Sequence, residues 1–181
     1  MIRHFFISMI LAAAVFVSTV PAAACGERVE VRFFESDGDI FEITNKSRGP
    51  MNLASLTIRL AGSRGRLIFD TEFGGPGASM AQPFEPFAGE VGLEAATPVG
   101  DGGEVMWLKF SGFEPGRRFE FMIDVDDRVE SAEFGRTVVS GDEIEGAGAE
   151  AVLMRADGGT SRIRGRFGSD GRALLRGGVC A

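Results

Sequence analysis

The sequence is built from short segments in which apolar and polar residues alternate, and this pattern limits the fold more than any other feature. In RVEVRFFE, residues 28–35, valine or phenylalanine occupies three alternate positions. The segment LASLTIRL, residues 53–60, repeats the spacing with leucine and isoleucine. Alternation with a period of two is typical of a half-buried β-strand. Further strands are predicted at residues 39–45, 66–70, 104–111 and 118–124.

The last third of the chain has the pattern of consecutive hairpins. Three strand-like segments, AEAVLMR, SRIRGRF and RALLRGG, are separated by the turn sequences ADGGT and GSDG. Glycine-containing loops of this length between strands are typical of β-hairpins. Glycine is frequent along the whole chain, with 26 residues and no repeating period, which indicates many short strands joined by tight turns.

Roughly nine or ten short strands in one domain, residues 25–181, predict an all-β fold. The expected architecture is a single β-sandwich of Ig-like, fibronectin-like or jelly-roll type, and a closed β-barrel is the alternative. The turn at Pro115-Gly116, followed by an aromatic strand, resembles the connection that precedes the corner tyrosine of fibronectin-like sandwiches. Phe119 stands where that tyrosine is expected.

The N-terminus has the pattern of a secretory signal peptide, predicted over residues 1–24. Arg3 and His4 precede an apolar run at residues 5–20, and Pro21 and three alanines follow it. This order is typical of a cleaved leader, and the run is shorter than the roughly 20 residues of a membrane span. We therefore expect an exported domain in the periplasm, at the cell surface or outside the cell, without a transmembrane segment in the mature chain.

Two cysteines lie near the ends of the expected mature chain, Cys25 and Cys180. Two cysteines in an exported protein favour a disulfide, which here would join the two ends and requires the first and last strands to be neighbours. Acylation of Cys25, as in a lipoprotein, is the alternative, although the leucine usually found three residues before such a cysteine is missing.

Histidine is absent from the expected mature domain, because His4 is the only one in the chain. A Ser-His-Asp triad, a Cys-His pair and metal sites built on imidazole are therefore excluded. The net charge is −7 and no basic stripe is evident in the sequence, which argues against nucleic acid or an anionic membrane as a partner. Any metal ligands are expected to be oxygen atoms.

An acidic cluster follows the strand predicted at residues 118–124. In FMIDVDDR, Asp124 and Asp126 share one face of an extended chain, roughly 7 Å apart, and Asp127 points to the other face. Ca²⁺ takes six to eight oxygen ligands, so such a site needs further acids from other loops. A solvated acidic strand end without metal is the alternative. The candidate Ca²⁺ ligands are Asp124, Asp126, Asp127, Asp37, Asp39 and Asp70.

Catalysis by a carboxylate pair is the least favoured interpretation. A glycan hydrolase needs two carboxylates across a groove, and such grooves usually offer aromatic platforms. Tyrosine is absent and Trp107 is the only tryptophan, in the middle of a predicted strand, where we expect a core position. Arg162, Arg164 and Arg166 share one strand face, which predicts a solvated or edge face, with an acidic ligand such as a polysaccharide as the alternative.

The segments DGDIFEITNKS, SLTIRLAGSRGRLIFD and FSGFEPGRRFEFMIDVDD together resemble exported bacterial proteins known as aggregation factor core proteins. The resemblance spans residues 35–127 and implies extracellular, calcium-associated adhesion. We therefore expect a secreted, non-enzymatic binding or adhesion module that Ca²⁺ stabilises, with an extracellular protein or polysaccharide as its partner. A structural envelope or matrix domain without a ligand is the alternative, and a carboxylate-dependent glycan hydrolase is a third.

Overall fold

The computed structural model describes residues 26–78, 80–129 and 135–177. The expected signal peptide at residues 1–24, and both Cys25 and Cys180, lie outside these ranges, so the leader and the disulfide stay predictions. Within the described ranges, no helix has the length and apolar character that a bilayer crossing requires.

All regular secondary structure in the described residues is β, which confirms the predicted all-β class. Most predicted strands are present with ends shifted by one or two residues. Two further strands, at Glu85–Ala88 and Leu93–Ala96, were not predicted. The strands are β1 (Arg28–Phe34), β2 (Ile40–Asn45), β3 (Met51–Arg59), β4 (Ile68–Asp70), β5 (Glu85–Ala88), β6 (Leu93–Ala96), β7 (Val105–Phe110), β8 (Arg118–Met122), β9 (Asp124–Asp126), β10 (Gly148–Arg155), β11 (Thr160–Arg166) and β12 (Arg172–Arg176).

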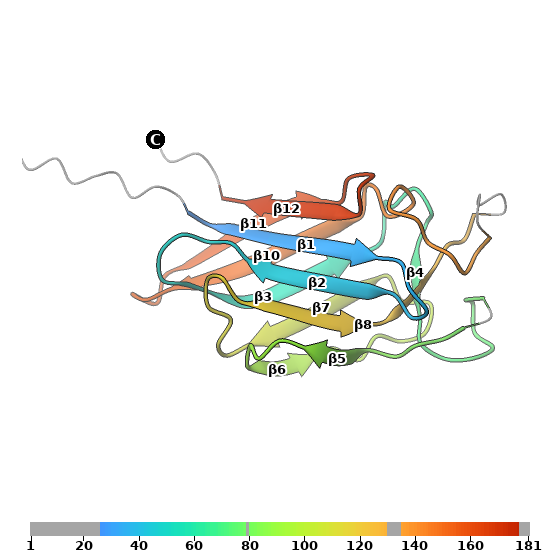
Figure 1. Cartoon of the computed structure of the whole chain (residues 1–181), viewed down its shortest axis with the longest axis horizontal. Coiled ribbons are helices and arrows are strands. Elements are labelled where there is room, and N and C mark those ends of the chain that lie inside the picture. The colour runs from blue at the N-terminus through green and yellow to red at the C-terminus, as the bar shows by residue number, and fades with distance from the viewer. Residues whose placement is uncertain (1–25, 79, 130–134, 178–181) are drawn as a thin grey trace, which may run out of the picture.

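Ten strands form one antiparallel sheet in the order β5-β8-β2-β1-β12-β11-β10-β3-β7-β6, and β4 pairs with β9 in a second, two-stranded sheet. The large sheet curls over, so that β8, β2, β1 and β12 form a front layer and β11, β10, β3 and β7 form a back layer (Figure 1). Two layers are the arrangement of a sandwich, while the β11–β12 pairing joins them along one edge as in a barrel.

Phenylalanine fills much of the space between the layers. Phe41 on β2 stacks on Phe121 of the neighbouring β8, with ring centroids 5.3 Å apart, and lies 5.2 Å from Phe33 of β1. Phe69 of β4 packs against the same ring at 6.4 Å, so the small sheet shares the core of the large one. These side chains occupy the inward positions that alternation predicts.

The ends of the described chain lie together. Arg28 of β1 is paired with Arg176 of β12, and the amide of Gly177 donates a hydrogen bond to the carbonyl of Glu27 at 3.3 Å. The first and last strands are therefore neighbours, which is the premise of the predicted disulfide.

The strand β4, which pairs with the acidic strand β9, lies at the opposite end of the sheet from the start of β1 and the end of β12 (Figure 1). The strand predicted to run on to Asp124 ends at Met122, and after Ile123 the chain moves into the second sheet as β9. The amide of Ile123 donates to the carbonyl of Asp39 at 3.1 Å, which fixes the point of the switch. The carboxylates therefore belong to a separate short strand that pairs with β4.

Candidate metal centre

The pairing of β4 with β9 brings three aspartates onto one face of the small sheet. Asp70 lies directly opposite Asp124, and Asp126 is two residues further along β9 on the same side. One carboxylate oxygen of each lies within 4.8 Å of the others. All three residues are buried, with exposed fractions of 3%, 4% and 0%. Backbone register alone therefore gathers three acids in a place shielded from water.

Each of the three carboxylates has one buried oxygen that has no hydrogen-bond partner. Oδ1 of Asp70, Oδ2 of Asp124 and Oδ1 of Asp126 are buried and accept no hydrogen bond. None of the three forms an ion pair among the described residues. A buried carboxylate without a partner is costly, so this cluster requires either protons or a cation.

A glycine-rich loop closes over the acids. The Cα of Gly77 sits so close that a Cβ there would lie 2.1 Å from Oδ2 of Asp70 and 2.7 Å from Oδ2 of Asp126. The next amide, of Ala78, donates a hydrogen bond to Oδ2 of Asp126. The loop covers the buried cluster and donates a hydrogen bond to one carboxylate oxygen. It donates none to the buried oxygens that lack a partner.

A fourth carboxylate, Asp101, adjoins the cluster and was not predicted. Its Oδ1 accepts hydrogen bonds from the amides of Thr71 at 2.9 Å and Glu72 at 3.3 Å. Its carboxylate neighbours that of Asp70 closely enough to raise the pKa of Asp70. The sequence DGG at residues 101–103 indicates only a turn, and no local pattern places this turn beside β4.

Burial and mutual repulsion raise the pKa values of the gathered acids. Loss of water, together with the neighbouring carboxylates of Asp101 and Asp126, raises the pKa of Asp70 to about 7. Burial and the charge of Asp70 raise the pKa of Asp124 to about 6. Burial likewise raises the pKa of Asp126 to about 6, although the Ala78 amide and the positive charge of Arg136 oppose the shift. A bound cation would stabilise the ionised forms instead.

Asp39, one of the predicted ligands, is buried beside the cluster but is already engaged. Its Oδ2 accepts the amide of Val125 at 3.0 Å, and its Oδ1 accepts the amide of Ser36 at 3.3 Å. Burial raises its pKa to about 8, and the charge of Asp124 adds to the shift. We interpret Asp39 as a clamp between the β1–β2 loop and β9.

The remaining predicted ligands, Asp37 and Asp127, lie apart from the three gathered acids. Asp37 is exposed at the tip of the β1–β2 loop. Asp127 is buried on the other side of the chain, where its Oδ1 accepts the amide of Val129 at 2.8 Å. Its charged neighbours are Glu143 and Arg136. Asp127 follows the last residue of β9 and is not one of the three gathered acids.

The arrangement fits a hard divalent cation of the size of Ca²⁺. Ca²⁺ binds oxygen at about 2.3–2.6 Å, so ligands on opposite sides of the ion lie about 5 Å apart, and the three oxygens fall within that limit. Asp70, Asp124 and Asp126 would hold the ion, with Asp101 adjacent. The ion would supply a positive charge in direct contact with acids that form no ion pair with a described side chain.

Comparison with known proteins gives no independent guide to the site. No protein family model, curated protein or solved structure matches this chain.

Proposed function

We propose that this protein is an exported, non-enzymatic binding module whose acidic end is held together by one Ca²⁺ ion. The observation that carries the proposal is the set of buried, unpartnered carboxylate oxygens on Asp70, Asp124 and Asp126. Ionised, these groups destabilise the fold, and a cation among them removes the repulsion. The assignment to export comes from the leader-like sequence at residues 1–24.

A structural role for the ion is favoured over a catalytic one. A catalytic metal keeps an open position for substrate and water, whereas the backbone of Gly77 lies directly on Asp70 and Asp126. Four segments meet at the site, namely β4, β9, the loop that contains Gly77 and the loop that contains Asp101. An ion shared by β4 and β9 would fix the end of the sandwich from which the loops extend. Loops held on a rigid scaffold are the usual place for binding residues.

Calorimetric titration with CaCl₂ tests the proposal on protein first freed of metal with EDTA. We expect one Ca²⁺ per chain for the wild type and loss of that binding in Asp126→Asn. Asp37→Asn is the matched control, because it removes an exposed aspartate of the neighbouring loop, and its titration should equal that of the wild type. Absence of Ca²⁺ binding to the wild type at millimolar concentrations would leave a ligand-free structural domain, with protonated acids, as the better description.

A further inference from the structure

Trp107 lies on the outer surface of the back layer, where the sequence predicted a core residue. It is 38% exposed, while its neighbours Met106 and Leu108 point into the core and are buried. On the adjacent β3, Thr57 is its cross-strand partner, and the next outward residue of β3 is Arg59. The outer surface of the back layer therefore presents a solvent-exposed indole diagonally beside a guanidinium.

A hollow lies next to this pair because glycine interrupts a row of side chains. The register aligns Arg59 of β3, Gly148 of β10 and Arg166 of β11 across the sheet. A Cβ at Gly148 would meet nothing within 4 Å, so the outer surface there is open. Arg59, Gly148 and Arg166 help to line a depression of about 370 Å³. Arg59 and Arg166 thus lie on either side of a hollow whose base is the backbone at Gly148.

The charges of this surface are poorly balanced. Four arginines, at positions 59, 162, 164 and 166, surround one glutamate, Glu150, which gives a net charge of +3 for these five side chains. Glu150 pairs with Arg164 at 2.6 Å and with Arg162 at 3.4 Å. Arg59 and Arg166 form no ion pair with any described residue, and Nη1 of Arg166 donates only to the carbonyl of Gly146 at 2.9 Å.

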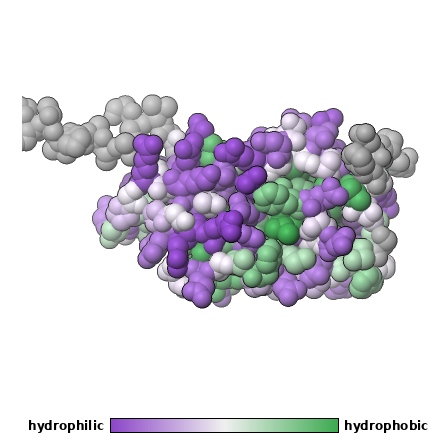
Figure 2. Space-filling model, viewed as in Figure 1, coloured by the Kyte–Doolittle hydropathy of each residue, from purple (hydrophilic) through white to green (hydrophobic). Residues whose placement is uncertain are grey.

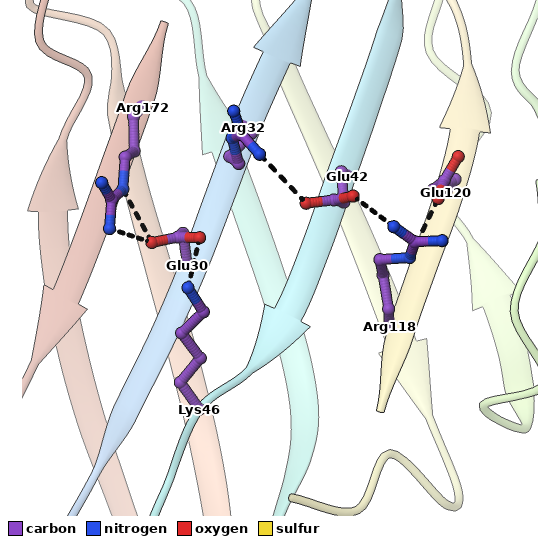
Figure 3. Close-up of polar contacts among 7 residues, drawn as sticks. All are labelled: Glu30, Arg32, Glu42, Lys46, Arg118, Glu120 and Arg172. Carbon is purple, nitrogen blue, oxygen red and sulfur yellow. Dashed lines mark hydrogen bonds and ion pairs between the residues drawn. The ribbon is translucent and has the colours of Figure 1, made fainter. Parts of the chain in front are cut away.

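The front layer of the same protein carries a group of charged side chains in which every cation is paired. There, Glu30, Glu42 and Glu120 alternate with four cationic side chains, and each cation contacts a glutamate (Figure 3). Glu30, for example, contacts Lys46 at 2.6 Å and Arg172 at 2.5 Å. Hydrophilic side chains cover much of this front layer (Figure 2). Arg28 and Arg176, at one end of the front layer, also form no ion pair with a described residue. What distinguishes the back layer is that its unpaired arginines, Arg59 and Arg166, lie on either side of the hollow at Gly148.

We infer that the outer surface of β11, β10, β3 and β7 binds an anionic polysaccharide, with Arg59 and Arg166 holding a carboxylate or sulfate group above Gly148 and Trp107 packing against a sugar ring. Guanidinium groups form bidentate hydrogen bonds with planar or tetrahedral anions. Tryptophan offers a large rigid apolar surface with a polar edge. The inference gives a ligand class to the proposed binding module and rests on that proposed function.

A sugar polymer fits this surface better than nucleic acid does. Duplex DNA carries one phosphate per about 1.7 Å and is bound by extended runs of cations. Here Glu150 lies inside the basic group, and the chain as a whole carries −7. Anionic groups that are spaced apart by sugar rings require only separate cationic positions. Arg59 and Arg166, on either side of Gly148, provide one such position.

Affinity electrophoresis in native gels that contain a polysaccharide tests the inference. Hyaluronan carries only carboxylates and dextran sulfate only sulfates, so the two arms distinguish the anion, and unmodified dextran is the uncharged control. We expect retardation of the wild type by at least one of the two anionic polymers. The Arg59→Ala/Arg166→Ala variant should weaken binding at least tenfold, and Trp107→Ala several-fold. Arg32→Ala, which removes one guanidinium from the front layer, should change binding less than twofold.

Measurements in CaCl₂ and in EDTA separate this inference from the metal proposal. Each surface variant should keep the Ca²⁺ response of the wild type, which verifies that it is folded. Absence of retardation in both anionic gels would overturn the inference while the metal site stands. Equal loss in Arg32→Ala, or tighter binding of oligodeoxythymidine than of either polysaccharide, would also overturn it. Retardation without any Ca²⁺ response would support the surface and count against the metal proposal alone.

Discussion

Asp70 and Asp124 face each other directly across the β4–β9 pair, both buried and both with an oxygen that accepts no hydrogen bond. Like charges directly opposite on a sheet destabilise it even at an exposed position. At a buried position the repulsion is larger because the local dielectric constant is low. Two facing buried carboxylates are compatible with a stable fold if a cation lies between them or if protons neutralise them.

Removal of one carboxylate should stabilise the metal-free protein. In EDTA at pH 7.5, we expect Asp70→Asn to raise the free energy of unfolding by about 1–3 kcal/mol, because the variant loses a buried charge beside two others. In CaCl₂ the same variant should be less stable than the wild type, since the ion loses a ligand. Urea unfolding in both buffers measures the two effects, and Asp37→Asn should show neither. Destabilisation of the variant in EDTA would mean that Asp70 makes a favourable interaction in the metal-free state.

The stability of the metal-free protein should fall as the pH rises from about 5 to about 8. The folded pKa values of Asp70, Asp124 and Asp126 are about 7, 6 and 6, against an ordinary value of 3.8. Between these limits the folded state binds more protons than the unfolded state, so each pH increase favours unfolding. Asp39, with a pKa of about 8, extends the range upward.

Ca²⁺ should remove most of this pH dependence at the upper end of the pH range, because the bound ion takes the place of the protons. Below pH 6, protons should compete with Ca²⁺ for the carboxylates. Melting temperatures from pH 5 to 8, in EDTA and in CaCl₂, test the pair of expectations. A metal-free protein that gains stability over this range would contradict the assignment of raised pKa values to the cluster.

Gly77 should tolerate no side chain. A Cβ at this position would overlap Oδ2 of Asp70 at 2.1 Å, so Gly77→Ala must displace the loop or the carboxylates. We expect at least a tenfold loss of Ca²⁺ affinity, measured by calorimetric titration. Gly100→Ala is the control at the same end of the sandwich, since a Cβ there would meet nothing within 4 Å. Wild-type affinity in Gly77→Ala would show that the loop does not cover the ion.

Phe41 should be the most sensitive aromatic position of the core. It is fully buried and contacts the rings of Phe33, Phe69 and Phe121. Truncation to alanine leaves a cavity and should cost about 3–5 kcal/mol in the free energy of unfolding. Phe73→Ala, at a position 78% exposed, should cost little. Chemical denaturation of both variants provides the comparison.

Alternation predicted the fold class because a strand with one face in the core repeats every second residue. It also placed Asp124 and Asp126 on one side and Asp127 on the other. It could not reveal the switch between sheets at Ile123, since both sides of that residue continue the same period. The contribution of Asp101 depends on a loop packing against β4, which no local pattern encodes.

The surface position of Trp107 could have been predicted from the same alternation. Lys109 has the same parity as Trp107, while Met106 and Leu108 have the other. A charged side chain on one face and apolar side chains on the other indicate which face meets solvent. The size of tryptophan suggested a core position, and the parity of its neighbour contradicted it.

Thermal unfolding at pH 7.5 with 1 mM CaCl₂, compared with excess EDTA, tests the central claim most directly. A ligand that binds only the folded state raises the melting temperature with its concentration. We predict a clear increase for the wild type and for Asp37→Asn, and none for Asp126→Asn. Coincident melting curves of the wild type in the two buffers would contradict the claim that a cation holds the acidic end of this protein together.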